Sequence, residues 1–424
     1  MTTANVLQEL EWRGFVQQAT PGLAAHFAKG PVTAYCGFDP TAPSLQLGNL
    51  MPLMLLANLQ RGGNRPIVLM GGGTGLIGDP SGKVGERPLL SKEQIRENLQ
   101  RQRDQMARFL EFGAGPTAAL LLDNAKWLGS QGLIDFLRDV GKHFTVNIML
   151  QKESVKARLE AGLSFTEFSY MLLQAYDFLH LFRERQCTLQ VGGSDQWGNI
   201  TAGVDLIRRI ENAEAHGLVA PLVTMASGKK FGKSEEGAIY LDPKVTSPYK
   251  FYQFWINTDD RDVENYLKLF TLKSKDEIAN LMVLHHGDPS KRIAQTALAQ
   301  DVTARVHGAV ALETTVSASA ILFGDLTVST ALSEEALHAI EGEVPTTILM
   351  EGESDLSVID ALVKSGLAKS KGEGRRAIEQ GGIYVNQQRV VDSTRKLEHK
   401  DWIGGRRVLL RKGKKDYALL RREG

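Results

Sequence analysis

The chain has 424 residues, of which 42% are hydrophobic and 23% are charged, as is usual for a globular protein of two or three domains. The N-terminus lacks the basic start and apolar core of a signal peptide, and the longest apolar stretch, residues 50–59, is too short to span a bilayer. The two cysteines, Cys36 and Cys187, form no metal-binding cluster, which excludes a disulfide scaffold and a zinc site. We therefore expect a cytoplasmic protein without membrane association.

The formal net charge is +1, but it is unevenly distributed. Residues 351–424 contain 17 basic and 11 acidic side chains, which leaves a net charge of −5 on the other 350 residues. A basic C-terminal segment favours an anionic partner such as nucleic acid. A solvated basic surface is the alternative, and composition does not separate the two.

The first 220 residues alternate between predicted strands and helices. Short apolar runs at residues 32–36, 67–70, 118–122 and 188–191 are typical of buried parallel strands. Helical patterns begin at Ser91 and at Ser164, each followed three residues later by a Gln or Glu that completes a capping box, and extend to about residues 112 and 185. This order predicts an α/β fold with a parallel sheet, whose ligands bind at the carboxyl ends of the strands.

The rest of the chain divides into three parts. Residues 247–320 are predominantly helical, and the adjacent His285 and His286, which lack metal-ligand partners in sequence, are expected at the surface. Residues 320–350 have the composition of a linker. Beyond them, two helices and two strand pairs, turning at residues 386–388 and 412–414, predict a small α+β module. The expected domains are 1–225, 226–320, a linker over 321–350, and 351–424.

A glycine-rich loop follows the second predicted strand. Gly73, Gly75 and Gly78 match the Gly-x-Gly-x-x-Gly pattern of dinucleotide-binding proteins. However, Asp79-Pro80 interrupts the chain where the helix of that motif would begin, and the acidic residues about 20 positions later lie within a helix. The loop therefore predicts a close approach of backbone to some ligand, but not a NAD site.

Four separated segments together carry a family resemblance: residues 35–42 with 46–49, residues 78–83, residues 192–199, and residues 230–234. Their order and spacing resemble class I aminoacyl-tRNA synthetases, and most closely the bacterial tyrosyl-tRNA synthetase family, over nearly the whole chain. The resemblance implies a Rossmann-like catalytic domain with a dimerisation insertion, a signature loop and helical domain, and a C-terminal module similar to an S-four-like RNA-binding domain.

The resemblance also implies a reaction. Tyrosine and ATP form tyrosyl-adenylate and pyrophosphate, and the tyrosyl group then passes to the 3′ end of tRNA(Tyr). No protein nucleophile is needed, so catalysis consists of positioning and charge stabilisation. No dedicated metal site is visible in the sequence, and Mg²⁺ is expected on the ATP phosphates. The residues expected to act on the phosphates are Lys230, Lys233, Gln46, Asn49, Lys83 and Arg87.

One motif departs from the family. Where the family has His-x-Gly-His, this chain has Gln46-Leu47-Gly48-Asn49. Gln46 and Asn49 donate hydrogen bonds through neutral amides, but neither carries a charge. Our hypothesis is that neutral hydrogen bonding suffices here and that the lysines supply the charge.

Tyrosine selection is expected on the helix that begins at Ser164. Tyr170, Gln174 and Asp177 are spaced i, i+4, i+7 and so share one face, although a solvated face has the same spacing. By resemblance, Tyr35 and Asp177 contact the substrate phenol, and Asp195 contacts the ribose. The complete tyrosine-binding set is Tyr35, Asp79, Tyr170, Gln174, Asp177 and Gln196; the ATP-binding set is Gly37, Asp39, Gly48, Gly193, Asp195 and Lys233.

The resemblance further implies a homodimer, with residues 136–149 at the interface, although core packing explains the apolar character of that segment equally well. It places tRNA on the C-terminal module, where the candidate RNA-binding residues are Lys371, Arg375, Arg376, Lys412 and Lys414. Two rival functions stay open at this point. One is a sister synthetase for tryptophan, and the other is an RNA-binding paralogue that has lost catalysis.

Overall fold

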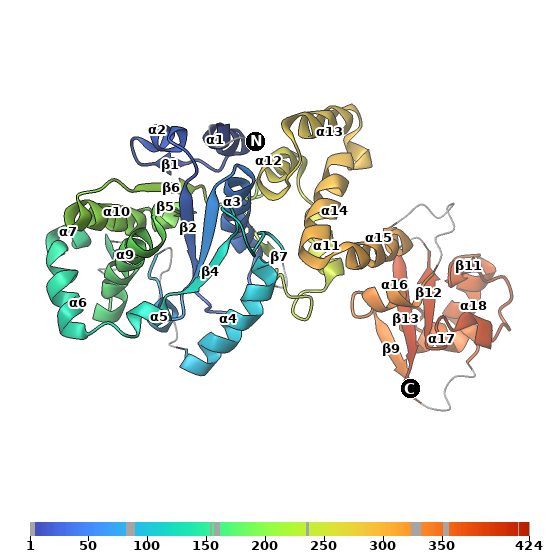
Figure 1. The fold of residues 1–424 in the computed structure, drawn as a ribbon. Helices are drawn as coiled ribbons and strands as arrows, with labels where there is room; N and C mark the ends of the chain where they lie inside the picture. Colours follow the sequence, from blue (N-terminus) through green and yellow to red (C-terminus); the bar gives the residue numbers. More distant parts are fainter. Residues whose placement is uncertain are drawn as a thin grey trace. The chain divides into compact units, whose positions relative to one another are not determined.

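The computed structural model describes residues 5–81, 90–152, 155–156, 162–234, 237–323, 332–350, 356–413 and 415–423. The chain divides into two compact units (Figure 1). Unit 1 comprises Met1–Thr246 and Phe254–Val306, and unit 2 comprises Ser247–Gln253 and His307–Gly424. Three candidate site residues, Lys83, Arg87 and Lys414, lie outside the described residues.

Unit 1 contains a six-stranded sheet within the described residues, with the strand order β1-β6-β5-β2-β3-β4. Strands β2 to β6 pair in parallel, and only β1 runs antiparallel, against β6. The strands are β1 (Gln18–Ala19), β2 (Thr33–Phe38), β3 (Arg65–Met70), β4 (Leu120–Asp123), β5 (Cys187–Gly193) and β6 (His216–Ala220). All four strands predicted from the sequence are present, and the α/β prediction is confirmed.

The strand order places a crevice between β2 and β5. The chain leaves β2 to build β3 and β4 on one side, and returns to build β5 and β6 on the other. Connections therefore run in opposite directions from the carboxyl ends of these two neighbouring strands, which is where open α/β sheets bind ligands.

Helices cover both faces of this sheet. Helices α9 (Phe165–Arg185) and α10 (Trp197–Glu211) pack against each other and against the face that carries Tyr35, Ile67 and Leu69. Helix α3 (Leu50–Arg61) contacts β2, β3 and β5 from the other face. The Ser164 hydroxyl accepts the Glu167 amide N–H at the start of α9, as the sequence predicts.

Helix α4 (Lys92–Met106) begins with the predicted capping box: Ser91 and Gln94 exchange hydrogen bonds of 2.9 and 3.2 Å. It ends about six residues earlier than its sequence pattern indicates. The remaining elements of unit 1 before residue 247 are α1 (Val6–Arg13), α2 (Leu23–Ala28), α5 (Ala125–Leu128), α6 (Leu133–Asp139), α7 (Val146–Leu150), and a two-stranded sheet of β7 (Lys233–Ser234) and β8 (Gly237–Ala238).

The helical region that follows is confirmed as α11 (Pro248–Ile256), α12 (Asp260–Phe270), α13 (Lys275–Gly287), α14 (Ile293–His307) and α15 (Ala309–Phe323). The buried Arg13 of α1 donates hydrogen bonds of 2.7 to 3.0 Å to the backbone carbonyls of residues 268, 271 and 273. It thereby satisfies carbonyls at the C-terminal end of α12, which have no partner within the helix.

One surface prediction is wrong. His286 is exposed, but His285 is 1% exposed and lies 3.3 Å from the Asp260 carboxylate. The reason is helical spacing: Ile278, Met282 and His285 follow at i, i+4 and i+7, so His285 belongs to the buried stripe of α13.

Unit 2 is built on a five-stranded sheet, again within the described residues, with the order β11-β10-β12-β13-β9. Its strands are β9 (Thr346–Leu349), β10 (Ile383–Val385), β11 (Gln388–Arg389), β12 (Arg407–Lys412) and β13 (Asp416–Arg422). One face packs on α17 (Val358–Lys364) and α18 (Lys371–Glu379). The other packs on α15 and α16 (Glu334–Ala339). Both predicted strand pairs form.

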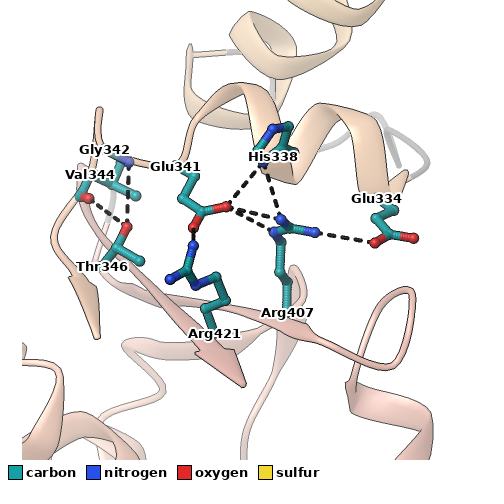
Figure 2. A network of polar contacts seen from close by, with 8 residues as sticks. All are labelled: Glu334, His338, Glu341, Gly342, Val344, Thr346, Arg407 and Arg421. Atoms are coloured by element: carbon teal, nitrogen blue, oxygen red, sulfur yellow. Dashed lines mark hydrogen bonds and ion pairs between the residues drawn. The ribbon is translucent and has the colours of Figure 1, made fainter. Parts of the chain in front are cut away.

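The expected linker, residues 321–350, contains more regular structure than its composition indicates. Helix α16 and strand β9 both fall within it, and β9 pairs in parallel with β13. Figure 2 shows the polar contacts that fix α16: the carboxylate of Glu341 accepts hydrogen bonds from Arg407 and Arg421, and it lies 3.1 Å from Nδ1 of His338. Residues 334–349 are therefore part of the folded unit 2.

Candidate active site

A cavity of about 460 Å³ opens at the carboxyl ends of β2 and β5 in unit 1. It lies in the crevice that the strand order creates. The cavity brings together most of the tyrosine- and ATP-binding candidates, which come from segments as far apart as residues 35 and 230. The candidates that line it are Tyr35, Gly37, Asp39, Gly48, Asn49, Asp79, Tyr170, Gln174, Asp177, Gly193, Asp195, Gln196 and Lys230.

Asp177 lies deep in this cavity, with 2% of its surface exposed. Each of its carboxylate oxygens accepts one hydrogen bond, at 2.8 Å from Nδ2 of Asn124 and at 2.7 Å from the indole N–H of Trp127. Burial raises the pKa of Asp177 to about 7, although these two donors oppose the shift. A carboxylate held in this way retains lone pairs that can accept a further hydrogen bond from a ligand.

Tyr35 is the second buried polar group at this end of the cavity. Its side chain is 1% exposed, and its hydroxyl has no hydrogen-bond partner among the described residues. Burial, followed by the nearby Asp177 carboxylate, raises the pKa of Tyr35 well above its usual value. An unpartnered buried hydroxyl is costly, so its position in a cavity points to a ligand that carries a polar group.

An amide network forms the next part of the wall. Gln196 donates a hydrogen bond of 2.6 Å to the Asp79 carboxylate, and Gln174 donates one of 3.3 Å to Gln196. Nδ2 of Asn199 lies 3.1 Å from Oε1 of Gln174. Asn199, together with Asn124 and Trp127, belongs to the site although sequence reasoning missed all three. Asn199 lies within residues 192–199, one of the segments that carry the family resemblance, and this was the one sequence signal for its place in the site.

Asp39 is fixed from two sides. It accepts hydrogen bonds of 2.9 Å from the Tyr170 hydroxyl and 2.8 Å from the Thr74 hydroxyl. A Cβ atom at Gly71 would collide with the Asp39 carboxylate, so the glycine-rich loop is glycine-rich here because Asp39 and Thr74 occupy that space. The loop therefore supports a carboxylate of the cavity, and the close approach seen at Gly71 is to a side chain of the protein, whereas the sequence predicts an approach to a ligand.

The opposite wall carries Gly193 and Asp195, which follow β5. Partial burial and the nearby Asp79 carboxylate raise the pKa of Asp195. Cys36 also lines the cavity, and burial raises the pKa of its thiol to about 12, which disfavours the thiolate form that a nucleophile needs.

The segment of residues 46–49 and the lysine loop (residues 230–234) lie side by side. The Leu47 N–H donates to the carbonyl of Ile239, and the Ile239 N–H donates to that of Gly232. Gly232 has a φ of +76°, and a Cβ atom there would lie 3.0 Å from Cβ of Leu47. Only glycine suits this conformation and this close approach.

Not every phosphate candidate reaches the cavity. Asn49 lines it. Its Oδ1 accepts the backbone N–H of Gln46 at 2.8 Å, so the NH₂ group is the part of its amide that can donate to a ligand. Gln46 is exposed and does not line the cavity. Lys230 lines the cavity, whereas the exposed Lys233 does not; neither lysine has an ion-pair partner among the described residues.

The RNA-binding candidates fall on two elements of unit 2. Arg375 and Arg376 are exposed on α18, and the largely exposed Lys371 pairs with Asp360 at 2.6 Å. Nζ of Lys412 donates to Glu373 at 2.6 Å, which ties the β12–β13 hairpin to α18. The candidates on α18 and on β12 therefore lie close together, but Lys412 is engaged within the protein.

Two features are absent from the described residues. None of their helices is long and apolar enough to cross a membrane. They also contain no group of three or more His, Cys, Asp or Glu side chains that could hold a metal ion.

Comparison with known proteins gives two family matches. Residues 28–324 match the family described as tRNA synthetases class I (W and Y), and residues 336–420 match the tyrosine–tRNA ligase SYY-like C-terminal domain. The second match separates the tyrosine branch from the tryptophan branch, because it describes a domain of tyrosine–tRNA ligases.

Individual relatives agree with these matches. The chain is 54% identical to a tyrosine–tRNA ligase of Anaeromyxobacter dehalogenans, over 98% of this chain and 99% of that protein. It is also 54% identical to one of Roseiflexus castenholzii, over 99% and 100%. A C-terminally truncated mitochondrial tyrosyl-tRNA synthetase of Aspergillus nidulans has a similar structure, with a TM-score of 0.67 and 32% identity over 73% of this chain and 92% of that one. The chain therefore belongs to the tyrosine–tRNA ligase family of class I tRNA synthetases.

Proposed function

We propose that the chain uses the cavity at β2 and β5 to join L-tyrosine to ATP, and that it transfers the tyrosyl group to the 3′ end of tRNA(Tyr). The observation that carries this proposal is that two buried polar groups line the same cavity: the Asp177 carboxylate and the Tyr35 hydroxyl, which has no hydrogen-bond partner among the described residues. Together they can accept and donate hydrogen bonds to one phenolic hydroxyl. The family membership supplies the reaction.

Tyrosine is selected over phenylalanine because only tyrosine carries a hydroxyl that can form hydrogen bonds with Asp177 and Tyr35. A bound phenol donates to Asp177 and accepts from Tyr35, which removes the cost of the unpartnered hydroxyl. Phenylalanine leaves the Tyr35 hydroxyl without a partner and gives the Asp177 carboxylate no hydrogen bond beyond those of Asn124 and Trp127, and such a penalty exceeds the small difference in apolar contact between the two substrates. Asn124 and Trp127 hold the carboxylate in place, so it need not reorganise when the substrate binds.

The α-amino group of tyrosine is bound by the Asp79 carboxylate, which Gln196 holds in place before substrate arrives. An ammonium group offers three donors and a positive charge to this acceptor. The resemblance assigns Tyr170, Gln174 and Asp79 to this role and places Gln196 near the same site, and the hydrogen bonds among Gln174, Gln196 and Asp79 support it. The Asp39 carboxylate, held by Tyr170 and Thr74, keeps its assignment to ATP.

Adenylate formation needs positive charge at the α-phosphate as the tyrosine carboxylate attacks it. Lys230 stands at the cavity, and Lys233 follows three residues later in the same exposed loop. Contacts that these lysines make only in the transition state accelerate the step, instead of merely tightening ATP binding. Asn49 adds a neutral donor next to the lysine loop. Mg²⁺ enters as part of the ATP substrate.

A homodimer and a cytoplasmic location complete the proposal. Helix α6 exposes Leu133, Ile134 and Leu137, and α7 exposes Val146 and Ile148. A cluster of large exposed apolar side chains is typical of a protein–protein interface. These residues lie in and beside the segment 136–149 that the resemblance assigns to the dimer contact, which is why we place the interface there.

Equilibrium binding tests tyrosine recognition. Titration calorimetry of the full chain with tyrosine, phenylalanine and tryptophan should detect strong binding of tyrosine alone. The variant Asp177→Asn should weaken tyrosine binding more than tenfold, because a hydrogen bond to a charged group contributes about 1.5–3 kcal/mol. Glu211→Gln, which alters an exposed ion pair with Arg183, is the control. Equal binding of tyrosine and phenylalanine would refute the assignment.

Aminoacylation tests the role of unit 2. A chain that ends at Phe323 should activate tyrosine but charge tRNA poorly, because it lacks α18 and the β12–β13 hairpin. The full chain with Arg375→Ala and Arg376→Ala should charge tRNA more weakly at low salt, and its charging should fall less steeply than that of wild type as salt rises, because fewer phosphate contacts release fewer counterions. Full charging by both proteins would contradict an RNA-binding role for unit 2.

A further inference from the structure

His180 lies one helical turn beyond Asp177 on α9 and stacks on the ring of Trp127. The two ring centroids are 4.2 Å apart and the ring planes are inclined by 19°. Trp127 in turn donates its indole N–H to Oδ1 of Asp177 at 2.7 Å. Neither His180 nor Trp127 is among the residues that line the cavity.

The position of the Trp127 ring decides whether Asp177 keeps both of its donors. Trp127 belongs to α5, which has only four residues, and its ring is partly exposed. A helix this short gives little rigidity of its own. A flat ring stacked on the indole restricts its rotation, and that restriction fixes the direction of its single N–H donor.

His180 is suited to this role. It is half-buried on a 21-residue helix that packs on the sheet and on α10, so its backbone is firmly placed. Burial lowers the pKa of its imidazole, so the ring is neutral at pH 7 and stacks as a planar aromatic group. The ring of Tyr176, one turn earlier on the same helix, has its centroid 6.5 Å from that of His180.

We propose that His180 is a positioning residue for tyrosine selection: by stacking on Trp127, it aims the indole N–H at Asp177 and so holds the carboxylate where it meets the substrate phenol. The inference deepens the proposed function and rests on it. It concerns substrate affinity and selectivity, and not the chemical step. His180 therefore acts on KM for tyrosine and leaves kcat and KM for ATP unchanged.

Kinetics of tyrosine-dependent pyrophosphate exchange test the proposal. His180→Ala should raise KM for tyrosine about three- to tenfold, the value of one stacked ring pair, and should reduce the preference for tyrosine over phenylalanine. His180→Phe keeps a flat ring and should restore most of the affinity. The matched control is His26→Ala, since His26 is also half-buried and packs on another ring, that of His216, but lies outside the cavity wall.

A double-mutant cycle separates positioning from a general loosening of α9. Trp127→Phe keeps a ring for His180 to stack on but removes the N–H donor. If His180 acts through that donor, His180→Ala should have no further effect on KM for tyrosine in the Trp127→Phe background. Additive effects in the cycle would overturn the proposal, as would failure of His180→Phe to rescue.

Measuring pyrophosphate exchange with the wild-type chain separates a failure of the His180 proposal from a failure of the proposed function. If the wild-type chain shows no tyrosine-dependent exchange, the function assignment fails. If wild type is active and His180→Ala matches it in KM and selectivity, only the role of His180 is refuted. Thermal unfolding curves of each variant show whether it is folded under the assay conditions, so that affinities are compared only among folded proteins.

Discussion

Phe231 stacks on Phe270 with ring planes only 2° apart and centroids separated by 5.2 Å. Phe231 is the second residue of the lysine loop, and Phe270 is the last residue of α12. The same ring also contacts Phe254, Trp255 and Tyr266. The loop therefore keeps Lys230 and Lys233 exposed while its own aromatic side chain is 7% exposed and anchored in the helical region.

This anchor predicts a kinetic defect. Phe231→Ala should lower kcat for adenylate formation about a hundredfold, because misplacing catalytic groups by about 1 Å costs that much. The dissociation constant for tyrosine should not change, since the phenol end of the cavity is built from other elements. Presteady-state measurement of adenylate formation gives both values. Phe323→Ala, an exposed phenylalanine, is the control, and equal defects in both variants would contradict the anchor.

Asp177 makes tyrosine binding depend on pH. Its pKa is raised to about 7, so it takes up a proton as the pH falls through 7, whereas the phenol binds best to the ionised carboxylate. KM for tyrosine should therefore rise as the pH falls from 8 to 6. In Asp177→Asn this part of the profile should be flat. An identical pH profile in both proteins would show that Asp177 does not titrate in this range.

The same shift has a consequence for folding. A carboxyl whose pKa is raised in the folded state stabilises the fold below its unfolded pKa, and loses that contribution as the pH rises through 7. Asp177→Asn should consequently unfold at higher urea concentration than wild type at pH 8. Asp177→Asn should thus weaken tyrosine binding but raise the stability of the fold. Urea titration of both proteins at pH 8 tests the expected gain in stability.

The segment of residues 46–49, where Gln46 and Asn49 replace the two histidines of the family motif, gives a prediction about these two side chains. Asn49 lines the cavity and Gln46 does not, so Asn49→Ala should lower kcat by about tenfold or more, the value of one hydrogen bond of about 1.5 kcal/mol in the transition state. Gln46→Ala should have a smaller effect. A larger loss in Gln46→Ala would show that Gln46 moves into the cavity when ATP binds, and would restore the role that the sequence motif assigns to it.

In unit 2, the Glu341 carboxylate contacts three side chains, those of His338, Arg407 and Arg421 (Figure 2). Burial opposes its ionisation, but hydrogen bonds from His338 and Arg407 outweigh burial and lower its pKa. Glu341→Ala removes two hydrogen bonds of Arg407, whose side chain is 10% exposed and which keeps Glu334 as an ion-pair partner, and should cost about 1.5–3 kcal/mol. Glu398→Ala, which breaks an exposed pair with Lys400, should cost less than about 1 kcal/mol. Urea unfolding of the full chain compares them.

The pH dependence of this contact follows from the direction of the shift. Because the pKa of Glu341 is lowered in the folded state, its contribution is present above the unfolded value and is lost as the pH falls through the folded value. Wild type should therefore lose stability under acidic conditions more steeply than Glu341→Ala. Parallel curves for the two proteins would contradict this assignment.

Much of the fold could be predicted from the sequence because strong local signals agreed with the tertiary structure. Apolar runs marked β2 to β5, and Ser91 and Ser164 marked the beginnings of α4 and α9. Signals were weaker where tertiary contacts decide the outcome. Helix α16 and strand β9 are short, and they are stabilised by Glu341 and by pairing with β13, neither of which leaves a periodic pattern.

The candidate site divides in the same way. Helical spacing placed Tyr170, Gln174 and Asp177 on one face of α9, the family resemblance assigned them to the site, and the cavity does contain all three. Trp127 was missed because it belongs to the four-residue helix α5, too short to show periodicity, and Asn124 was missed because it is the N-cap residue of that helix. Their importance arises only when β4 brings them within hydrogen-bond distance of Asp177, about 50 residues away in the chain.

Tyrosine-dependent exchange of labelled pyrophosphate into ATP tests the central claim most directly. The wild-type chain should catalyse exchange with tyrosine, and should do so poorly or not at all with phenylalanine and tryptophan, because only a phenol satisfies Asp177 and Tyr35 together. Exchange that is equally fast with phenylalanine, or absent with tyrosine while tRNA still binds, would contradict the account.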